Sequence, residues 1–274
     1  MAAMLQDRYG LLLSTTSAPA RDAYIRGVDC ILTATAGFER HLAEAMEADP
    51  QFALAQAALA RGLFAVQRVP EARREIAKAK ALAAGVSPRE QAHVNALALA
   101  IEGKPVEAMV ATREHLAQHP RDAMVLAPAT GVFGLIGFSG RQEREPELYE
   151  FLRTFAPAYG ADWWFESMLA FAACELGRLD EARTLIERSM AANPGNAHGA
   201  HIKVHVLYEC GEPRTGADYL RGWMPGFDRE GLLHCHLSWH VAIFALELGR
   251  TEEAWRPIAA ACAPAGPGGR RSTW

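Results

Sequence analysis

A short segment recurs along this chain at a nearly constant spacing, and this recurrence constrains the fold more than any other feature. The segments GRLDEA (residues 177–182) and GRTEEA (residues 249–254) are near copies, and GKPVEA (residues 103–108) is a third. The first position of the segment recurs every 34 to 38 residues, at Gln67, Gly103, Gly140, Gly177, Gly211 and Gly249. A period of this size indicates stacked supersecondary units.

Each unit reads as two helices joined by a turn. Apolar residues lie at helical spacing from residue 163 to 176, and Gly177 follows as a C-cap. A proline then ends the second helix, Pro120 twelve residues after Ala108 and Pro194 twelve residues after Ala182. The crossing of the two helices needs a small residue, supplied by Ala72, Ala108, Ala182 and Ala254.

These signals predict an all-α fold, because no segment has the strict alternation of a half-buried strand. The period is at or a little above the ~34 residues of a tetratricopeptide repeat. We therefore expect a right-handed α-solenoid of about six such helix-turn-helix units, which stack because one unit alone cannot bury its apolar face.

The ends of the chain differ from the repeats. We expect residues 1–22 to be an N-terminal extension, residues 23–262 to form the solenoid, and residues 263–274, rich in Pro, Gly and Arg, to be a disordered tail. Because no polar capping helix follows the last unit, its exposed face around Trp255 predicts a homo-oligomer, another partner or a shortened chain. Within the third complete unit, Pro128 and four following glycines predict a kink or close helix packing.

Composition excludes several classes of function. The net charge of −4 and the absence of a Lys/Arg block in the helical region give no reason to expect nucleic acid as a partner. The N-terminal apolar run, Leu11 to Leu13, is too short for a signal peptide or a membrane span. The five cysteines include no Cys-x-x-Cys pair, which favours reduced thiols in a cytoplasmic protein.

Most histidines fall on one predicted surface. In a tetratricopeptide unit numbered so that its Gly slot is position 15, positions 2, 5, 9 and 12 of the first helix line the concave groove. We therefore expect a ligand-binding groove lined by the side chains at these positions and at the equivalent positions of neighbouring units. They are His93, Trp164, His198, His201, His205, Tyr208, His236, Trp239 and His240.

Two pairs within this set have the spacing of a metal site. His201 with His205, and His236 with His240, are four residues apart, so each pair presents both rings on one helix face. Two such pairs on adjacent helices would supply four nitrogen ligands for a divalent metal such as zinc. The alternatives are a metal-free groove for a peptide or small ligand, and purely structural histidines.

Catalytic residues are not identified by the sequence. His-Glu-x-x-His is absent, and the nearest carboxylate, Glu209, lies beside Tyr208, so no general base for a metal-bound water is indicated. Cys235 lies between two histidines but is better interpreted as a packing residue than as a nucleophile. Whether the chain is an enzyme stays open, with a binding protein favoured.

Local motifs also resemble those of a known family. They are LSTTS (residues 13–17), ADPQF (48–52), REQAHV (89–94), HIKVHV (201–206) and CHLSWH (235–240). In this order they resemble the tetratricopeptide repeat protein 38 family, over about residues 13 to 255 of this chain, which would be a C-terminally shortened member.

The resemblance implies imperfect tetratricopeptide-like units without an established reaction. The recurrent histidines of the family fall on His93, His201, His205, His236 and His240. Gln56 and Thr130 stand where the family often has His, and Tyr208 where it often has Glu. We therefore expect a tetratricopeptide-like scaffold that binds a peptide, protein segment or small ligand in its groove, with a metal-dependent enzyme or metal binder as the alternative.

Overall fold

The structure, a computed structural model, describes residues 5–262. This part of the chain is all α-helical, as the sequence predicts, with 15 α-helices and no strand beyond one isolated bridge between Gln6 and Leu12. None of the helices in residues 5–262 is long and apolar enough to cross a membrane. The chain divides into two compact units, Met1–Leu32 with Gly37–Gly160, and Thr33–Ala36 with Ala161–Trp274.

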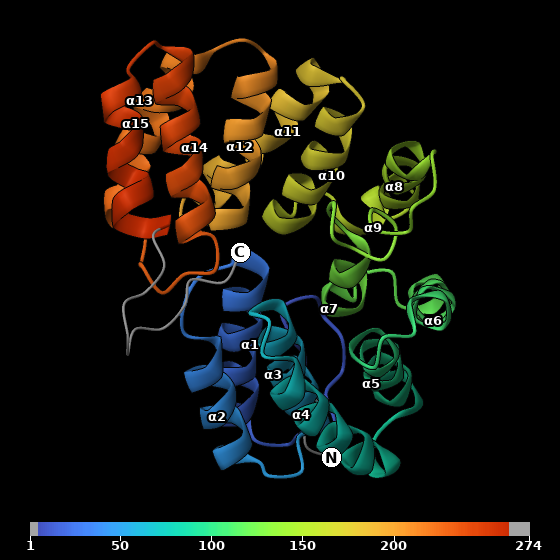
Figure 1. The fold of residues 1–274 in the computed structure, drawn as a ribbon. Coiled ribbons are helices and arrows are strands. Elements are labelled where there is room, and N and C mark those ends of the chain that lie inside the picture. The colour runs from blue at the N-terminus through green and yellow to red at the C-terminus, as the bar shows by residue number, and fades with distance from the viewer. Residues whose placement is uncertain (1–4, 263–274) are drawn as a thin grey trace. The chain divides into compact units, whose positions relative to one another are not determined.

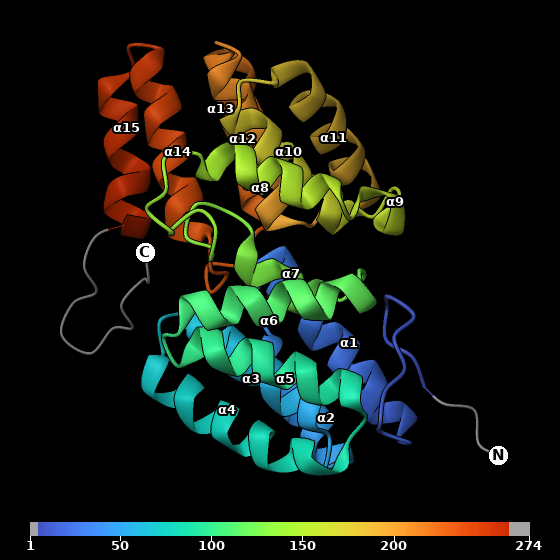
Figure 2. The same ribbon diagram turned by 90° about the vertical axis from the view of Figure 1, so that its right-hand side faces the viewer.

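The first unit holds nine helices and two short 3₁₀ turns. They are α1 (Ala18–Thr33), α2 (Phe38–Ala48), α3 (Ala53–Ala65), α4 (Val69–Leu82), η1 (Ala83–Gly85), α5 (Pro88–Ile101), α6 (Pro105–Gln118), α7 (Ala123–Leu126), η2 (Ala127–Ala129), α8 (Arg144–Arg153) and α9 (Ala156–Tyr159). Helix α3 packs on α4 and α5, and α5 packs on α4 and α6, so these helices follow one another in space as they do in sequence (Figure 2).

The second unit repeats this arrangement. Its elements are α10 (Trp163–Glu175), α11 (Leu179–Ala192), α12 (Ala197–Glu209), α13 (Pro213–Trp223), η3 (Met224–Gly226), α14 (His234–Glu247), α15 (Thr251–Pro257) and η4 (Ile258–Cys262). Each of α10, α12 and α14 packs on the helix that follows it, and α12 packs on both α10 and α14 (Figure 1, yellow to red). These sequential contacts are consistent with a helical repeat.

The predicted small residues lie where helix pairs cross. Ala72, Ala108 and Ala182 are completely buried and Ala254 is buried, each on the second helix of a pair. On α13 the same slot is Gly216, where an added Cβ would lie 2.3 Å from the ring of Phe244. The helix-ending prolines Pro120 and Pro194 are also confirmed, because each lies just beyond the end of a helix.

The third complete unit departs further from a helix than predicted. Instead of a kinked helix, α7 and η2 end at Ala129, and the chain runs through turns to α8. An added Cβ at Gly134 would lie 2.3 Å from the carbonyl oxygen of Thr130, and one at Gly137 would lie 2.4 Å from that of Gly131. Backbone therefore packs on backbone here, which only glycine permits.

The N-terminal boundary is earlier than predicted. Helix α1 begins at Ala18, inside the segment expected to be an extension, because Ser17 accepts a hydrogen bond from the backbone N–H of Ala20 and so caps the helix. The predicted tail, residues 263–274, lies outside the described residues. Trp255 on α15 is exposed, and the homo-oligomer predicted through this end stays a prediction.

The repeated glycine is explained by the turn that joins the two helices of a unit. At Gly177 the backbone has φ of 70°, and the N–H groups of Gly177 and Arg178 donate to the carbonyl oxygens of Cys174 and Ala173. This double hydrogen bond is the Schellman motif, which needs a left-handed residue. The first copy carries Gln67 at this position, with φ of 61°.

We predict that Gln67→Gly stabilises the first unit. A left-handed backbone costs a residue with a Cβ ~1–2 kcal/mol, and glycine avoids this cost. Glycine also gives the unfolded chain more conformational freedom, which removes ~0.4–1 kcal/mol of the stability gained. Urea unfolding should show a net increase of roughly 0.5–1 kcal/mol, whereas Gly103→Ala, in the equivalent turn, should lose about 1 kcal/mol. A loss of stability in Gln67→Gly would contradict this account of the repeat.

Candidate metal centre

Helices α12 and α14 bring the two predicted histidine pairs face to face. His201 and His205 lie one turn apart on α12, and His236 and His240 lie one turn apart on α14. The opposite faces of the helices are anchored in one apolar core, where Val204, Leu237 and Phe244 are fully buried. Because that core fixes the rotation of both helices, all four imidazoles face the same space.

The four rings converge through the same atom. The Nε2 of His201 lies 2.9 Å from the Nε2 of His205 and 2.8 Å from that of His236. The Nε2 of His240 lies 3.2 Å from that of His236, and one ligand atom from each ring falls within 4.8 Å of all the others. This part of the prediction is confirmed: these four residues form a group that is able to hold a metal ion.

Hydrogen bonds among the four rings satisfy their Nε2 atoms poorly. A ring nitrogen of neutral imidazole carries either one proton or one lone pair. The Nε2 atoms of His201 and His236 each take part in two close contacts, so each must divide a single proton or lone pair between two neighbours. A cation placed among four lone pairs would satisfy all four nitrogens at once.

The rings are neutral at physiological pH. Burial, followed by the charges of the neighbouring imidazoles, holds the pKa of His201 well below its ordinary value. Burial likewise lowers the pKa of His205 to about 4 and that of His240 to about 3, and it lowers the pKa of His236. Neutral imidazole is the form that binds metals, so the group is prepared for an ion without losing protons.

Aromatic side chains border the four-histidine group. The ring of Phe171, on α10, meets His205 edge-on at 6.0 Å between centroids. Trp239 stacks on His236 at 5.5 Å and is 38% exposed. Tyr208, on α12, is 42% exposed and donates a 3.5 Å hydrogen bond to Glu247. The group therefore has an apolar wall on one side and half-exposed aromatic rings nearby.

Other residues predicted for the groove lie elsewhere. His198 is on α12, one turn before His201, as predicted, but it is outside the converging set. Trp164 is only 1% exposed, so the prediction that it lines a groove is wrong. The reason is that α10, which packs on both α11 and α12, is buried over nearly its whole length. His93 is likewise 1% exposed and belongs to the first unit.

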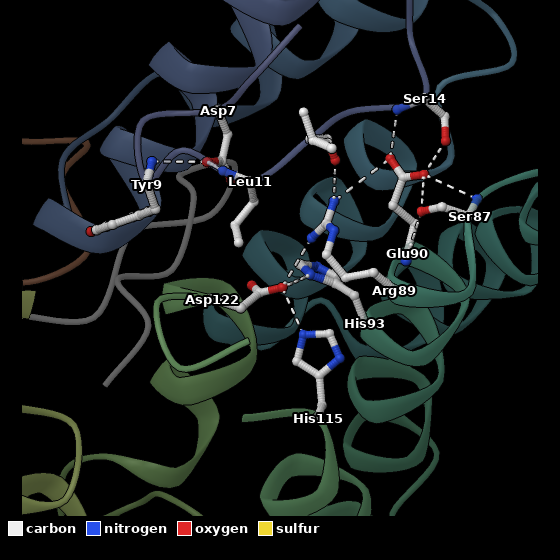
Figure 3. Close-up of polar contacts among 11 residues, drawn as sticks. Asp7, Tyr9, Leu11, Ser14, Ser87, Arg89, Glu90, His93, His115 and Asp122 are labelled. Atoms are coloured by element: carbon white, nitrogen blue, oxygen red, sulfur yellow. Dashed lines mark hydrogen bonds and ion pairs between the residues drawn. The ribbon is translucent and has the colours of Figure 1, made fainter. Parts of the chain in front are cut away.

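His93 belongs instead to a second polar group, inside the first unit. The Nδ1 of His93, on α5, and the Nε2 of His115, on α6, each lie 2.9 Å from Oδ2 of Asp122 (Figure 3). Arg89 donates to the same oxygen at 3.2 Å. Burial alone would raise the pKa of Asp122, but the two imidazoles outweigh it and hold that pKa well below the ordinary value.

A neighbouring carboxylate ties the N-terminal segment to α5. Glu90 accepts hydrogen bonds from the backbone N–H and hydroxyl of Ser14, and forms a capping box with Ser87 at the start of α5. Arg89 donates at 2.8 Å to the carbonyl oxygen of Leu12. This network, drawn in Figure 3, fixes the end of α5 from which His93 projects.

Sequence reasoning missed His115 and Asp122. Asp122 lies after the end of α6, so its distance from His115 along the chain follows no helical period. Only the turn after α6, in which the Asp122 N–H donates to the carbonyl oxygen of His119, brings its carboxylate back to His115.

In comparisons with known proteins, no family's sequence profile matches this chain. The two histidine groups therefore have to be interpreted from their own geometry.

We predict that Asp122→Asn destabilises the protein and alters its response to acid. Removing one partner of a buried ion pair costs roughly 3–5 kcal/mol. Because folding lowers the pKa of Asp122, its contribution is present above the ordinary carboxyl pKa of about 3.9 and is lost as the pH falls below it. Urea unfolding at a series of pH values should therefore show a shallower loss of stability in acid for the variant.

A matched control is Asp218→Asn, which removes a carboxylate paired with Arg221 on the surface of α13. An exposed pair contributes about 0–1 kcal/mol, so this variant should keep the acid response of the wild type. Equal behaviour of the two variants would contradict the assignment of acid sensitivity to Asp122.

Proposed function

We propose that this protein binds a divalent transition-metal ion through His201, His205, His236 and His240, and that the ion holds α12 and α14 together. The observation that supports this most strongly is the convergence of the four Nε2 atoms, three of whose separations are 2.8–3.2 Å. In tetrahedral zinc sites with Zn–N bonds of about 2.0–2.1 Å, the nitrogens lie roughly 3.3 Å apart. These three separations need to widen only slightly to admit the ion.

The ligand set favours a closed site. Four protein ligands complete a tetrahedral shell, as in structural zinc sites, whereas catalytic zinc sites keep one position for water. Imidazole ligands suit zinc, copper, nickel and iron. All four rings are neutral, so the bound ion keeps its charge of +2, which the protein can use to attract an anionic group to the half-exposed side of the site.

Metal binding should be lost in His201→Gln/His240→Gln, which removes one ligand from each helix and retains polar side chains. After chelation and removal of the chelator, tag-free wild-type protein should take up zinc at this site, and saturation at about 100 times Kd should add ~2.7 kcal/mol of stability. For a domain of this size the melting temperature should rise by roughly 5–10 °C.

The matched control is His234→Gln, which changes a histidine of α14 whose ring stacks on Phe227 rather than on the other four. It should bind zinc like the wild type. If wild-type protein takes up no zinc, copper, nickel or iron and its melting temperature stays constant, the metal-binding proposal fails.

We also propose a second function, in which the protein is a tetratricopeptide-like scaffold similar to the tetratricopeptide repeat protein 38 family. This scaffold would bind a peptide or protein segment beside the metal centre. Two observations support it: the helices pack sequentially, and Tyr208 and Trp239, close to the histidines, are 42% and 38% exposed. Exposed aromatic side chains with nearby polar groups are typical of peptide-binding surfaces.

Peptides selected from a displayed random library on the wild-type protein test this function. Those that bind the groove should lose at least tenfold in affinity, about 1.4 kcal/mol, against Tyr208→Ala/Trp239→Ala. Trp255→Ala, which removes an exposed tryptophan from α15, is the control and should bind as the wild type does. Selected peptides that bind all three proteins equally would contradict the scaffold proposal.

A further inference from the structure

The polar group around Asp122 carries an excess of buried negative charge. Three carboxylates, Asp122, Glu90 and Asp7, lie near the guanidinium of Arg89, and burial raises the pKa of Asp7. Asp122 and Glu90 are almost fully buried. With neutral imidazoles, the three carboxylates and one guanidinium sum to two negative charges, which a protein interior does not tolerate without compensation.

Two compensations are conceivable. Protonating both His93 and His115 would add two positive charges. A divalent cation supplies the same charge and leaves both rings neutral. Either would compensate the carboxylates, and the positions of the donor atoms favour the cation.

The donor atoms suit such an ion. His93 Nδ1 and His115 Nε2 are each 2.9 Å from Asp122 Oδ2, and the three atoms lie within 4.8 Å of one another. Ligands at about 2.0–2.2 Å from a metal and at right angles to each other are roughly 3 Å apart. Two histidines and one carboxylate on a shared face form the ligand set of non-haem iron sites, which leave further positions open.

The surroundings provide the support and the space that a metal site needs. Arg89 is held by the Leu12 carbonyl and donates to Asp122, as outer hydrogen-bond donors do to metal-bound carboxylates. A cavity of about 320 Å³ between α5 and α6 adjoins the group, with Asn95, Glu114, His115 and His119 in its lining. The cavity is large enough for several water molecules or a small ligand.

We propose that His93, His115 and Asp122 form a second metal site, which binds a divalent first-row ion such as Fe²⁺, Mn²⁺ or Co²⁺ and turns its open coordination positions toward this cavity. The site is independent of the four-histidine centre, since it uses other residues in the other compact unit. Its ligands include a carboxylate and its shell is open, so an exchangeable small molecule can bind directly to this ion, whereas four histidines would already fill the shell of the other.

Cobalt binding to the full chain tests the proposal. Equilibrium dialysis and visible absorption should give two equivalents of Co²⁺ per wild-type chain and one in His201→Gln/His240→Gln. The equivalent that remains should have the weak absorption of a five- or six-coordinate ion, because four-coordinate cobalt absorbs much more strongly. Adding His115→Gln to that double variant should abolish cobalt binding.

The control for His115→Gln is His119→Gln, which lies just beyond the end of α6 and in the wall of the same cavity. It should leave both equivalents in place. A double variant that is folded by circular dichroism and binds no Co²⁺ would overturn the second site, whether or not His115→Gln itself folds. Failure of the four-histidine centre would appear separately, as an unchanged cobalt stoichiometry between the wild type and the double variant.

Discussion

Close packing of consecutive helices at small residues is the constraint on which the rest of this structure depends. Ala72, Ala108 and Ala182 are completely buried where the second helix of a pair crosses its neighbour, and at Gly216 not even a Cβ fits beside Phe244. Such contacts fix the rotation of each helix about its axis as well as its distance from the next. A side chain on the remaining face is thereby aimed in a defined direction.

The four-histidine centre is a consequence of that rotation. Leu237 and Phe244 hold α14, and Val204 holds α12, in a common apolar core. The histidines that lie one turn apart on the adjoining faces of α12 and α14 therefore point toward one another. Their neutral state follows from the same packing, since burial lowers the pKa of each ring. An ion bound there would add a bond between helices that already touch.

The first unit differs in that it buries charged side chains. Asp122 lies in the turn between α6 and α7, where it orients two imidazoles and a guanidinium, while Glu90 binds the N-terminal segment through Ser14. These contacts join parts of the chain that are far apart in sequence. Moving these segments apart would leave a buried charge without its partner, which is strongly destabilising.

Turn geometry and helix periodicity make much of this fold predictable from the sequence. The glycine slot predicts the turns because a Schellman motif needs a left-handed residue, and the i,i+4 histidines predict two shared faces because a helix has 3.6 residues per turn. The same periodicity placed Trp164 and His93 in the groove, incorrectly, because it does not report how much of a helix its neighbours cover. Tertiary structure alone decided that α10 is buried almost all round, that His93 meets His115 and Asp122, and that four Nε2 atoms converge. The burial of α10 and the Asp122 group depend on contacts between segments whose separation along the chain carries no periodic signal, and the repeat alone does not fix the helix rotation that lets four Nε2 atoms converge.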